Sequence, residues 1–427
     1  MILVDKIGVK LKQQLRSKFI RNLGWLGGSE IAIRLVRLAV TVILARFLTP
    51  YDYGLGAVVL AVREFTQVFT RIGIGAKIVQ ADSEDLERLC NAGYWLNWVV
   101  FCGLFVGQCL VAFPVAWFYH DSKLILPICV SALVYLLTPM AAVQAALIHR
   151  ENRLEIAALA KTLQNSSNYV LSALLACLGL GMWAIVLPGV LVAPVWVWVY
   201  YSHHSWQPTS GLTTKDWPEI FSFGRNILGV ELLKALRNNL DYLIVGRFIG
   251  IAELGIYYFA FNAGLGISLS IISALNSALL PHLCAARSNW LEFRKRYWSS
   301  LKIIACIIVP LVVLQSSLAS FYVPTVFGKE WTAAIPILII ICLSAIPRPF
   351  AEAASQLLTA VGKPNLDLRW NVLFTTIFAI GLLIGVRWQA WGVATSVLLT
   401  HAIFLPLFVI WATNHVFHSS KLLTSNV

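Results

Sequence analysis

The stretch LARFLTPYDYG, from Leu44 to Gly54, returns in altered form as VGRFIGIAELG, from Val245 to Gly255. Matching positions lie 201 residues apart (46 to 247), and they are Arg46, Phe47, Asp52 and Gly54 against Arg247, Phe248, Glu253 and Gly255. Each copy comes directly after a long apolar run. Two apolar runs that end in the same motif indicate an internal duplication.

The composition is that of a membrane protein. Of the 427 residues, 59% are hydrophobic and only 12% are charged, with a mean hydropathy of +0.76, whereas a soluble domain carries about a quarter charged residues. The net charge of +13 is better explained by basic cytoplasmic loops than by nucleic-acid binding. The eight cysteines occur without a C-x-x-C pair and are interpreted as small apolar residues, not as disulfides or metal ligands.

About twelve runs are long and apolar enough to span a bilayer, which takes roughly 20 residues each. They lie near 23–46, 54–74, 92–118, 123–148, 156–178, 183–202, 224–248, 255–280, 299–323, 333–360, 370–387 and 390–413. The connections between them are short. Residues 1–22 differ, because Ile7, Leu11, Leu15 and Phe19 recur every four residues among lysines and arginines. This spacing predicts a basic amphipathic helix on an anionic membrane face.

The duplication extends beyond the opening motif. Glu30 matches Glu231 at the same offset, and QAALIHRENRLEI (Gln144–Ile156) resembles QLLTAVGKPNLDL (Gln356–Leu368). Six predicted helices in each half is an even number, so both halves have the same orientation in the membrane. Such a parallel repeat is related by an axis along the membrane normal.

We therefore predict an all-α polytopic membrane protein with about 12 transmembrane helices in two six-helix lobes. The lobes are residues 23–210 and 211–427, after the basic segment 1–22. Lysines and arginines gather in alternate connections, which places both termini in the cytoplasm. Two matched lobes around a central cleft suit alternating access to a substrate that lies between them.

Ionisable residues inside the predicted spans form the candidate site, because each costs about 2.5–3.5 kcal/mol at the bilayer centre unless it faces a cavity or a partner. The candidates for binding an anionic substrate are Arg34, Arg37, Arg63, Lys161, Lys234, Arg237 and Arg348. The candidates for a coupling ion are Glu64, Glu231, Asp241 and Glu352. At each position the alternative is an internal ion pair, such as Arg348 with Glu352, that ties helices together.

Three stripes of charge at helical spacing favour a ligand, because arginine and lysine exceed what the neighbouring acids neutralise. Arg34 and Arg37 share one stripe with Glu30, and Lys234 and Arg237 lie among acids in the matching helix. Surplus positive charge in a cleft attracts a diphosphate or an acidic sugar. His401, alone in the last predicted helix, is interpreted as a packed residue.

The sequence contains no nucleotide-binding G-x-x-x-x-G-K-[ST], no H-E-x-x-H and no Asp-x-Asp pair. We therefore expect no enzyme activity, no cofactor and no metal. The energy for transport would come from an ion gradient or from removal of the product.

Several motifs, in this order, are similar to one transporter family. They are LARFLTPYDYG with WLNW (Trp95–Trp98), LDYLIVGRFIGIAELGIY (Leu240–Tyr257), LLPHL (Leu279–Leu283), FGKEW with AAIP (Phe327–Pro336) and LLTAVGKPNLDLR (Leu357–Arg369). The chain resembles the oligosaccharide flippases of the MATE-like MOP superfamily, in the Wzx-type branch with colanic-acid and lipopolysaccharide O-unit exporters.

The resemblance implies a V-shaped cationic cavity and a polyprenyl-diphosphate-linked oligosaccharide as cargo. It implies a place in the bacterial cytoplasmic membrane and a role in export of O-antigen, exopolysaccharide or capsule. The expected partners are this lipid-linked oligosaccharide and membrane lipids, with a polysaccharide polymerase and the export machinery as further candidates, and no nucleic acid.

Other functions stay open at this point. The same superfamily contains multidrug exporters and peptidoglycan-precursor flippases. The arginine surplus disfavours a drug exporter, whose cationic cargo calls for acidic groups. A membrane polysaccharide polymerase or ligase would need a sizeable outer loop, and the predicted outer loops are only a few residues long.

Overall fold

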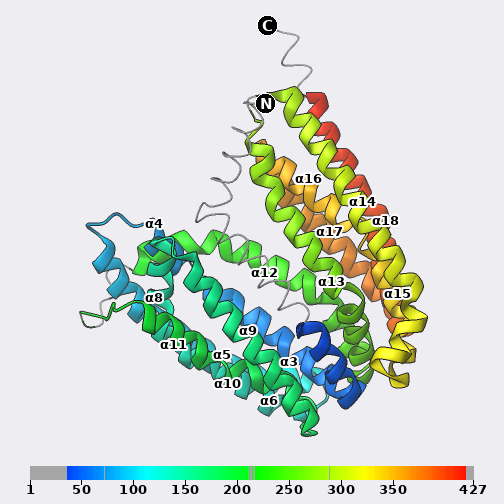
Figure 1. The fold of residues 1–427 in the computed structure, drawn as a ribbon, viewed down its shortest axis with the longest axis horizontal. Helices are drawn as coiled ribbons and strands as arrows, with labels where there is room; N and C mark the ends of the chain where they lie inside the picture. Colours follow the sequence, from blue (N-terminus) through cyan, green and yellow to red (C-terminus); the bar gives the residue numbers. More distant parts are fainter. Residues whose placement is uncertain are drawn as a thin grey trace, which may run out of the picture. The chain divides into compact units, whose positions relative to one another are not determined.

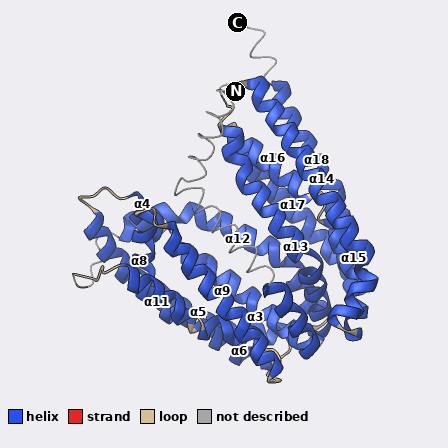
Figure 2. Ribbon diagram, in the orientation of Figure 1, coloured by secondary structure: helices blue, strands red, loops and turns tan. Residues whose placement is uncertain are grey.

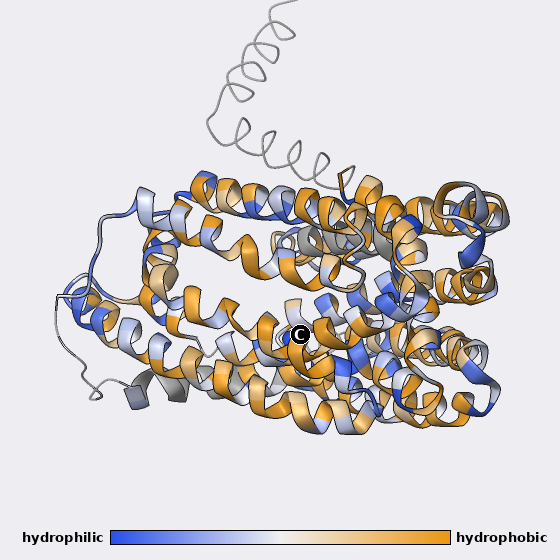
Figure 3. Ribbon diagram, turned by 90° about the horizontal axis from the view of Figure 1, so that it is seen from below, coloured by the Kyte–Doolittle hydropathy of each residue, from blue (hydrophilic) through white to orange (hydrophobic). Residues whose placement is uncertain are grey.

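The computed structural model describes residues 36–71, 73–209, 211, 214, 217–287 and 289–419. Within these residues every regular element is a helix (Figure 2). The helices carry mostly hydrophobic residues along their length, as Figure 3 shows in orange. The predicted segment 1–22 and Arg34 lie outside the described residues.

The chain folds into two compact units that do not divide at a single point of the sequence. Unit 1 comprises Met1–Phe47, Val62–Trp117 and Asp121–Gly229, and unit 2 comprises Leu48–Ala61, Phe118–His120 and Val230–Val427. Two short stretches from the first half of the sequence thus pack within unit 2. The predicted lobe boundaries at 23, 210 and 427 stay a prediction.

The elements of unit 1 alternate long helices with short, broken ones (Figure 1). They are the helix of residues 36–47, the second half of α3 (Pro50–Val68), η1 (Phe69–Arg71), α4 (Ile74–Gln80), α5 (Leu86–Tyr119), η2 (Ser122–Leu124), α6 (Ile125–Ala132), α7 (Val134–Leu137), α8 (Pro139–Arg150), α9 (Leu154–Cys177), α10 (Trp183–Leu191), α11 (Ala193–His203) and the start of α12 (Trp217–Phe248).

Two of the predicted continuous runs are broken in unit 1. The run 123–148 bends by 54° between Ser122–Leu137 and Pro139–Arg150. The run 183–202 divides into α10 and α11, with Pro194 in the first turn of α11. Proline has no backbone N–H, so it is tolerated at the start of a helix but interrupts the hydrogen bonds of a longer one. The hydropathy of the runs is continuous, but their backbone is not.

The connection after α3 contains a further short helix. This helix, α4, includes Lys77 and begins after Gly73, which is in the left-handed conformation (φ 84°). Ile74 and Ile78, four residues apart, are buried in a core with side chains of α5 and α8. This i, i+4 apolar pair stabilises α4. The charged residues around it make the helix hard to recognise from the sequence.

Unit 2 contains the first half of α3, the rest of α12, and the helices that follow. These are α13 (Ile251–Cys284), α14 (Trp290–Tyr322), the π-helical turn η3 (Val323–Phe327), η4 (Lys329–Ala334), α15 (Ile335–Ser344), α16 (Arg348–Ala360), α17 (Pro364–Gly385), η5 (Val386–Trp388) and α18 (Gln389–Ser419). The run 333–360 is broken here too, at Pro347 between α15 and α16. A break between two apolar segments leaves Arg348 in the first turn of α16.

The two copies of the repeated motif pack against each other within unit 2. The first copy starts α3 and the second starts α13. A Cβ atom added to Gly54 would lie 1.9 Å from the carbonyl oxygen of Ile251, and one added to Gly255 would lie 1.7 Å from the carbonyl oxygen of Pro50. Because carbon and oxygen approach no closer than about 3 Å without a bond, only glycine permits this crossing.

Five helical stretches among the described residues are long and apolar enough to cross a membrane. They are Leu86–Tyr119, Trp183–His203, Trp290–Phe327, Lys329–Ala360 and Pro364–Phe417. The last holds both α17 and α18, which are joined only by the short turn η5. Only 22–44% of the most apolar window in each stretch is buried. Long apolar helices with exposed apolar faces need lipid around them.

Candidate functional site

The structure divides the predicted site residues between the two units. Arg37, Arg63, Glu64 and Lys161 lie in unit 1, and Glu231, Lys234, Arg237, Asp241, Arg348 and Glu352 lie in unit 2. Each group is built from its own helices.

In unit 1 the side chain of Arg63 stands apart from the other candidates. Arg63 lies in α3, half-buried, with its guanidinium against Gly189 of α10, where an added Cβ would come 2.3 Å from Nη1. The Tyr135 hydroxyl donates a hydrogen bond to the backbone carbonyl of Arg63 (3.3 Å), not to its side chain. Among the described residues, the guanidinium of Arg63 has no carboxylate within 4 Å.

The other candidates of unit 1 are less enclosed. Glu64 on α3 and Lys161 on α9 are exposed, and Arg37 is half-buried in the helix of residues 36–47. No ion pair joins Arg63 to any of these three among the described residues. Among the candidates of unit 1, Arg63 is therefore enclosed by neighbouring helices, whereas the other three lie separately along the helices.

Unit 2 gathers its charges around Arg237 and Arg348, which the sequence places 111 positions apart (237 to 348). Nη1 of Arg237 on α12 donates a hydrogen bond to Oδ1 of Asn371 on α17. The guanidinium of Arg348 on α16 lies over the ring of Phe261 on α13, 5.8 Å from its centroid. Arg348 is within electrostatic range of Asp241, Glu352 and Arg237. The helices α12, α13 and α17 and the first turn of α16 thus meet at one polar centre.

Asp241 in α12 is the most enclosed of the predicted carboxylates, with only 5% of its surface exposed. Oδ2 accepts a hydrogen bond from the Tyr257 hydroxyl (2.9 Å), and Oδ1 accepts one from the backbone N–H of Tyr242 (3.0 Å). Tyr257 is fully buried in α13. Two donors hold the carboxylate in one orientation next to Arg348.

His401 is packed, as its isolation in an apolar run predicted. Its ring packs beside those of Phe374 and Phe378, with centroid distances of 5.8 and 5.6 Å, and these two rings are themselves 6.0 Å apart. Nδ1 is 3.2 Å from the carbonyl oxygen of Ser344 and 3.4 Å from Nε of Arg348. Nδ1 can accept a hydrogen bond from Arg348 Nε–H or, in the other tautomer, donate one to the Ser344 carbonyl, and both partners lie at the break before α16.

One predicted substrate residue instead forms the internal pair that was its alternative. Nζ of Lys234 lies 3.1 Å from Oε1 of Glu231, one turn earlier on α12. The lysine side chain is 55% exposed, so the pair contributes little stability. Lys234 is a weaker candidate than Arg237 on the same helix.

Sequence reasoning missed several polar partners in this centre. Asn371 on α17 receives the bond from Arg237, and Asp367, one turn earlier, accepts a 2.6 Å bond from the Ser355 hydroxyl. The spacing of Asp367, Asn371 and Thr375 on one face of α17 is a signal that could have found them. Tyr257 carried no such signal, because a tyrosine in an apolar run also packs as a ring.

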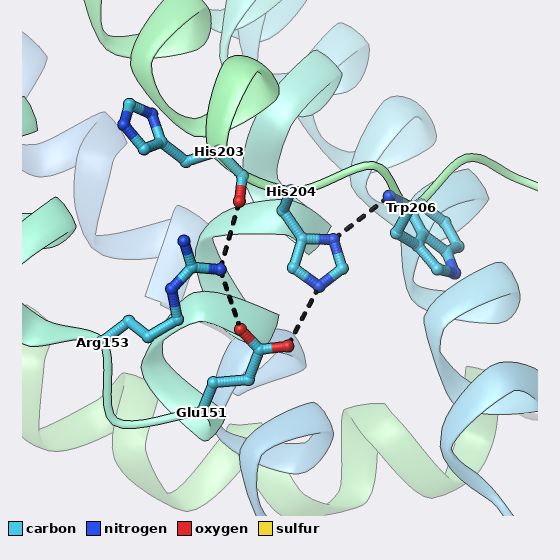
Figure 4. A network of polar contacts seen from close by, with 5 residues as sticks. All are labelled: Glu151, Arg153, His203, His204 and Trp206. Atoms are coloured by element: carbon cyan, nitrogen blue, oxygen red, sulfur yellow. Dashed lines mark hydrogen bonds and ion pairs between the residues drawn. The ribbon is translucent and has the colours of Figure 1, made fainter.

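A second polar network, shown in Figure 4, connects the turn between α8 and α9 to the segment at the end of α11. Glu151 binds Arg153 Nη1 (3.2 Å) and His204 Nε2 (3.4 Å), and His204 Nδ1 accepts a bond from the backbone N–H of Trp206 (3.1 Å). Gln144 also donates to the Trp206 carbonyl (3.0 Å). These bonds tie the segment after α11 to the rest of unit 1, which is a structural role.

The described residues contain no group of three or more histidine, cysteine, aspartate or glutamate side chains that could hold a metal.

Comparison with known proteins identifies the family. Residues 43–336 match the family model described as polysaccharide biosynthesis protein. The teichuronic acid biosynthesis protein TuaB of Bacillus subtilis (strain 168) is 24% identical over 366 residues, which cover 85% of this chain and 75% of TuaB. The lipopolysaccharide biosynthesis protein WzxC of Escherichia coli (strain K12) is 21% identical over 384 residues, which cover 87% of this chain and 76% of WzxC.

The fold is that of a transporter superfamily. An inward-facing multidrug resistance MATE family transporter of the MOP superfamily superposes with a TM-score of 0.74 at 13% sequence identity, over 91% of this chain and 96% of that chain. The likeness confirms the predicted all-α polytopic membrane fold and the MOP resemblance. By the match over most of its length, the chain belongs to the polysaccharide biosynthesis protein family and is a multi-pass membrane protein of MOP fold.

Proposed function

We propose that the protein flips polyprenyl-diphosphate-linked oligosaccharide repeat units across the bacterial cytoplasmic membrane by alternating access. The family match and the two relatives link it to the synthesis of cell-surface polysaccharides. The fold links it to transport. The step that joins these two properties is the transfer of a lipid-linked repeat unit from the face where it is made to the face where it is polymerised.

The observation that carries this proposal is a set of three arginines in apolar helices: Arg63, Arg237 and Arg348. Carboxylates lie near Arg237 and Arg348 but not in ion-pair contact with them. All three are half-buried in apolar helices, and none forms an ion pair within 4 Å with a described carboxylate. A charge at the bilayer centre costs about 2.5–3.5 kcal/mol on insertion scales. Such residues are retained where a ligand completes them.

Arginine is suited to this ligand for a geometric reason. Its planar guanidinium presents several N–H donors in a fork that can bind two phosphate oxygens at once. A drug exporter of the same fold would present carboxylates to a cationic cargo instead. The three arginines inside apolar helices favour the flippase over the exporter.

The coupling ion would be served by a carboxylate near these arginines. Asp241 is our first candidate, because Tyr257 and the Tyr242 N–H hold it fixed beside Arg348. Glu64 and Glu352 are exposed, and Glu231 is paired with Lys234. A change in the charge of Asp241 would alter the field at Arg348 and so couple the ion to the cargo.

The test replaces one arginine of each unit by an uncharged residue of similar length. Arg63→Gln and Arg237→Gln are expected to reduce export strongly, because loss of a hydrogen-bonded charge contact costs about 1.5–3 kcal/mol, or roughly ten- to hundredfold in affinity. Arg→Lys at the same positions keeps the charge but loses the fork, so it should rescue in part. Arg369→Gln, at an exposed position of α17, is the matched control.

The measurement combines surface polysaccharide, the amount of protein in the membrane and the pool of lipid-linked repeat unit in a strain that lacks the native gene. A flippase defect lowers the first, leaves the second and raises the third. Normal export by both Gln variants would refute the arginine site. A loss of protein in proportion to the loss of export would indicate that the arginines only stabilise the fold.

The proposed orientation has both termini in the cytoplasm. Cysteine at Lys329, the exposed first residue of η4, should react with an impermeant reagent in intact cells, and cysteine at Arg369 should not. The eight native cysteines are replaced first. The opposite pattern of labelling would reverse the orientation.

A further inference from the structure

The exposed side of α14 changes its chemistry along the helix. Its exposed large apolar residues from the fourth turn onward are Ile303, Ile307, Val313, Leu314, Leu318 and Phe321. Over the first four turns the exposed side carries three cations, Arg294, Lys295 and Lys302, with Leu291, Trp298 and one acid, Glu292, which pairs with Arg296. A cationic and aromatic stretch therefore runs directly into a face that only lipid tails can cover.

Two of these cations have no ion-pair partner among the residues that the structure describes. Arg296, on the inner side, binds Glu292 and the carbonyl oxygen of His282, and Arg294 lies over the ring of Phe417. Lys295 and Lys302 form no hydrogen bond or ion pair with any residue that the structure describes. They are seven residues apart, so they share one helix face with Trp298 between them.

The matching helix of the first half lacks this feature. Like α14, α5 begins with a Leu-Glu pair and carries Tyr-Trp shortly afterwards, at Tyr94 and Trp95. The only basic residue of α5 is Arg88, and it pairs with Asp85 at 3.0 Å. The lysines of α14 are therefore not shared by α5. This difference indicates a specific role for them in α14.

We propose that the start of α14 binds an anionic phospholipid of the surrounding membrane. The phosphate lies between Lys295 and Lys302, whose positions are about 10 Å apart along the helix axis and within reach of one headgroup through their flexible side chains. The indole of Trp298, 44% exposed, lies at the level of the glycerol. The acyl chains follow the apolar face at Ile303 and Ile307.

The apolar continuation is the reason for choosing a phospholipid over a soluble anion. A free phosphate would use the lysines and leave Trp298 and the adjoining apolar face without a role. A lipid with an anionic headgroup uses all of them in one binding mode. The inference goes beyond the proposed function, because it concerns the protein surface away from the arginine site and does not depend on the cargo.

The experiment uses the full-length protein in an uncharged detergent. Binding of phosphatidylglycerol and of phosphatidylcholine with the same acyl chains is measured by native mass spectrometry. Each lysine near an anionic headgroup contributes roughly a fivefold gain in affinity. Lys295→Gln with Lys302→Gln should therefore lower phosphatidylglycerol binding by about 25-fold and leave phosphatidylcholine binding unchanged.

Two controls accompany the double variant. Lys329→Gln removes an exposed lysine beyond the other end of α14 and should bind phosphatidylglycerol as the wild type does. Lys295→Arg with Lys302→Arg retains both charges and should also retain binding. The substituted positions are exposed, so the melting temperature should stay within about 1–2 °C.

Three results would overturn the proposal. They are equal binding of the two lipids by the wild type, unchanged phosphatidylglycerol binding by the double Gln variant, and an equal loss in Lys329→Gln. Preferential binding of polyprenyl phosphate at the same lysines would also overturn it, since the site would then belong to the cargo.

Discussion

The two copies of the repeated motif share a backbone crossing but differ in the side chains around it. Gly54 and Gly255 each face the first carbonyl of the other helix. The residue before each glycine is different, however. Tyr53 meets the rings of Trp331, Phe259 and Tyr258 with centroid distances of 4.9, 6.1 and 6.5 Å, whereas Leu254 is a fully buried aliphatic residue.

The N-termini of α3 and α13 are also capped in different ways. Thr49 begins α3 with a capping box, because its Oγ1 accepts the Asp52 N–H (3.2 Å) while Oδ2 of Asp52 accepts the Thr49 N–H (3.2 Å). Gly250, 201 positions later, begins α13 without a side-chain cap, at φ 132° and ψ 165°. Duplication has preserved the close approach of the helices, while the residues that fix each end have diverged.

The largest effect is expected where the copies touch. Gly54→Ala or Gly255→Ala places a methyl group within 2 Å of a backbone oxygen, so the helices must separate, at a cost of about 3 kcal/mol or more. Thermal unfolding followed by size-exclusion chromatography measures the loss. Gly103→Ala on α5, where an added Cβ meets nothing within 4 Å, is the control. Two variants as stable as this control would disprove the contact.

The second copy should be more sensitive to its capping position than the first. Gly250→Ala forces alanine into a region of φ and ψ that is essentially restricted to glycine, which costs about 1–3 kcal/mol although the space around the Cβ is open. The same thermal measurement applies. A stable Gly250→Ala variant would mean that this turn adopts a different backbone conformation.

The first copy should lose less at the matched position. Thr49→Ala removes one half of the capping box and should cost about 1 kcal/mol, whereas Thr49→Gly should cost only a few tenths. The expected order of stability is wild type, Thr49→Gly, Thr49→Ala. Equal stability of all three proteins would show that the box does not stabilise α3.

The smallest effect concerns the aromatic surroundings of the first copy. The Tyr53 hydroxyl is buried without a hydrogen-bond partner among the described residues, and a buried unsatisfied hydroxyl is unfavourable. Tyr53→Phe should therefore leave the melting temperature unchanged or raise it by about 1–2 °C. A marked fall would reveal a polar partner for this hydroxyl.

The candidate site was predictable in kind but not in detail. The sequence alone was enough to select Arg63, Arg237, Asp241 and Arg348 as candidates, because a charged residue inside an apolar run is costly to bury. Their partners could not be predicted. Lys234 with Glu231 was foreseeable from a spacing of three residues, but Arg237 with Asn371 joins helices separated by 134 positions. Contacts of that range depend on how helices pack, which a single sequence does not report.

Hydropathy determined the class of protein, an all-α membrane chain, and the repeated motif predicts that it is built from two related halves. Apolar length is a local property, and burial of backbone hydrogen bonds in lipid leaves the helix as the only solution for such runs. The sequence also revealed the duplicated motif, but it did not show that the glycines of the motif allow two helices to cross closely.

Only the tertiary structure decided that the two motifs pack against each other, that the runs break before Pro139 and Arg348, and that α4 is a helix with a buried face. Each of these results depends on atoms far apart in the chain. The crossing at Gly54 and Gly255 requires two helix starts to approach within the space of a missing methyl group. At the break before α16, the freed carbonyl of Ser344 meets the ring of His401 on α18 (3.2 Å). Hydropathy averaged along one run contains neither piece of information.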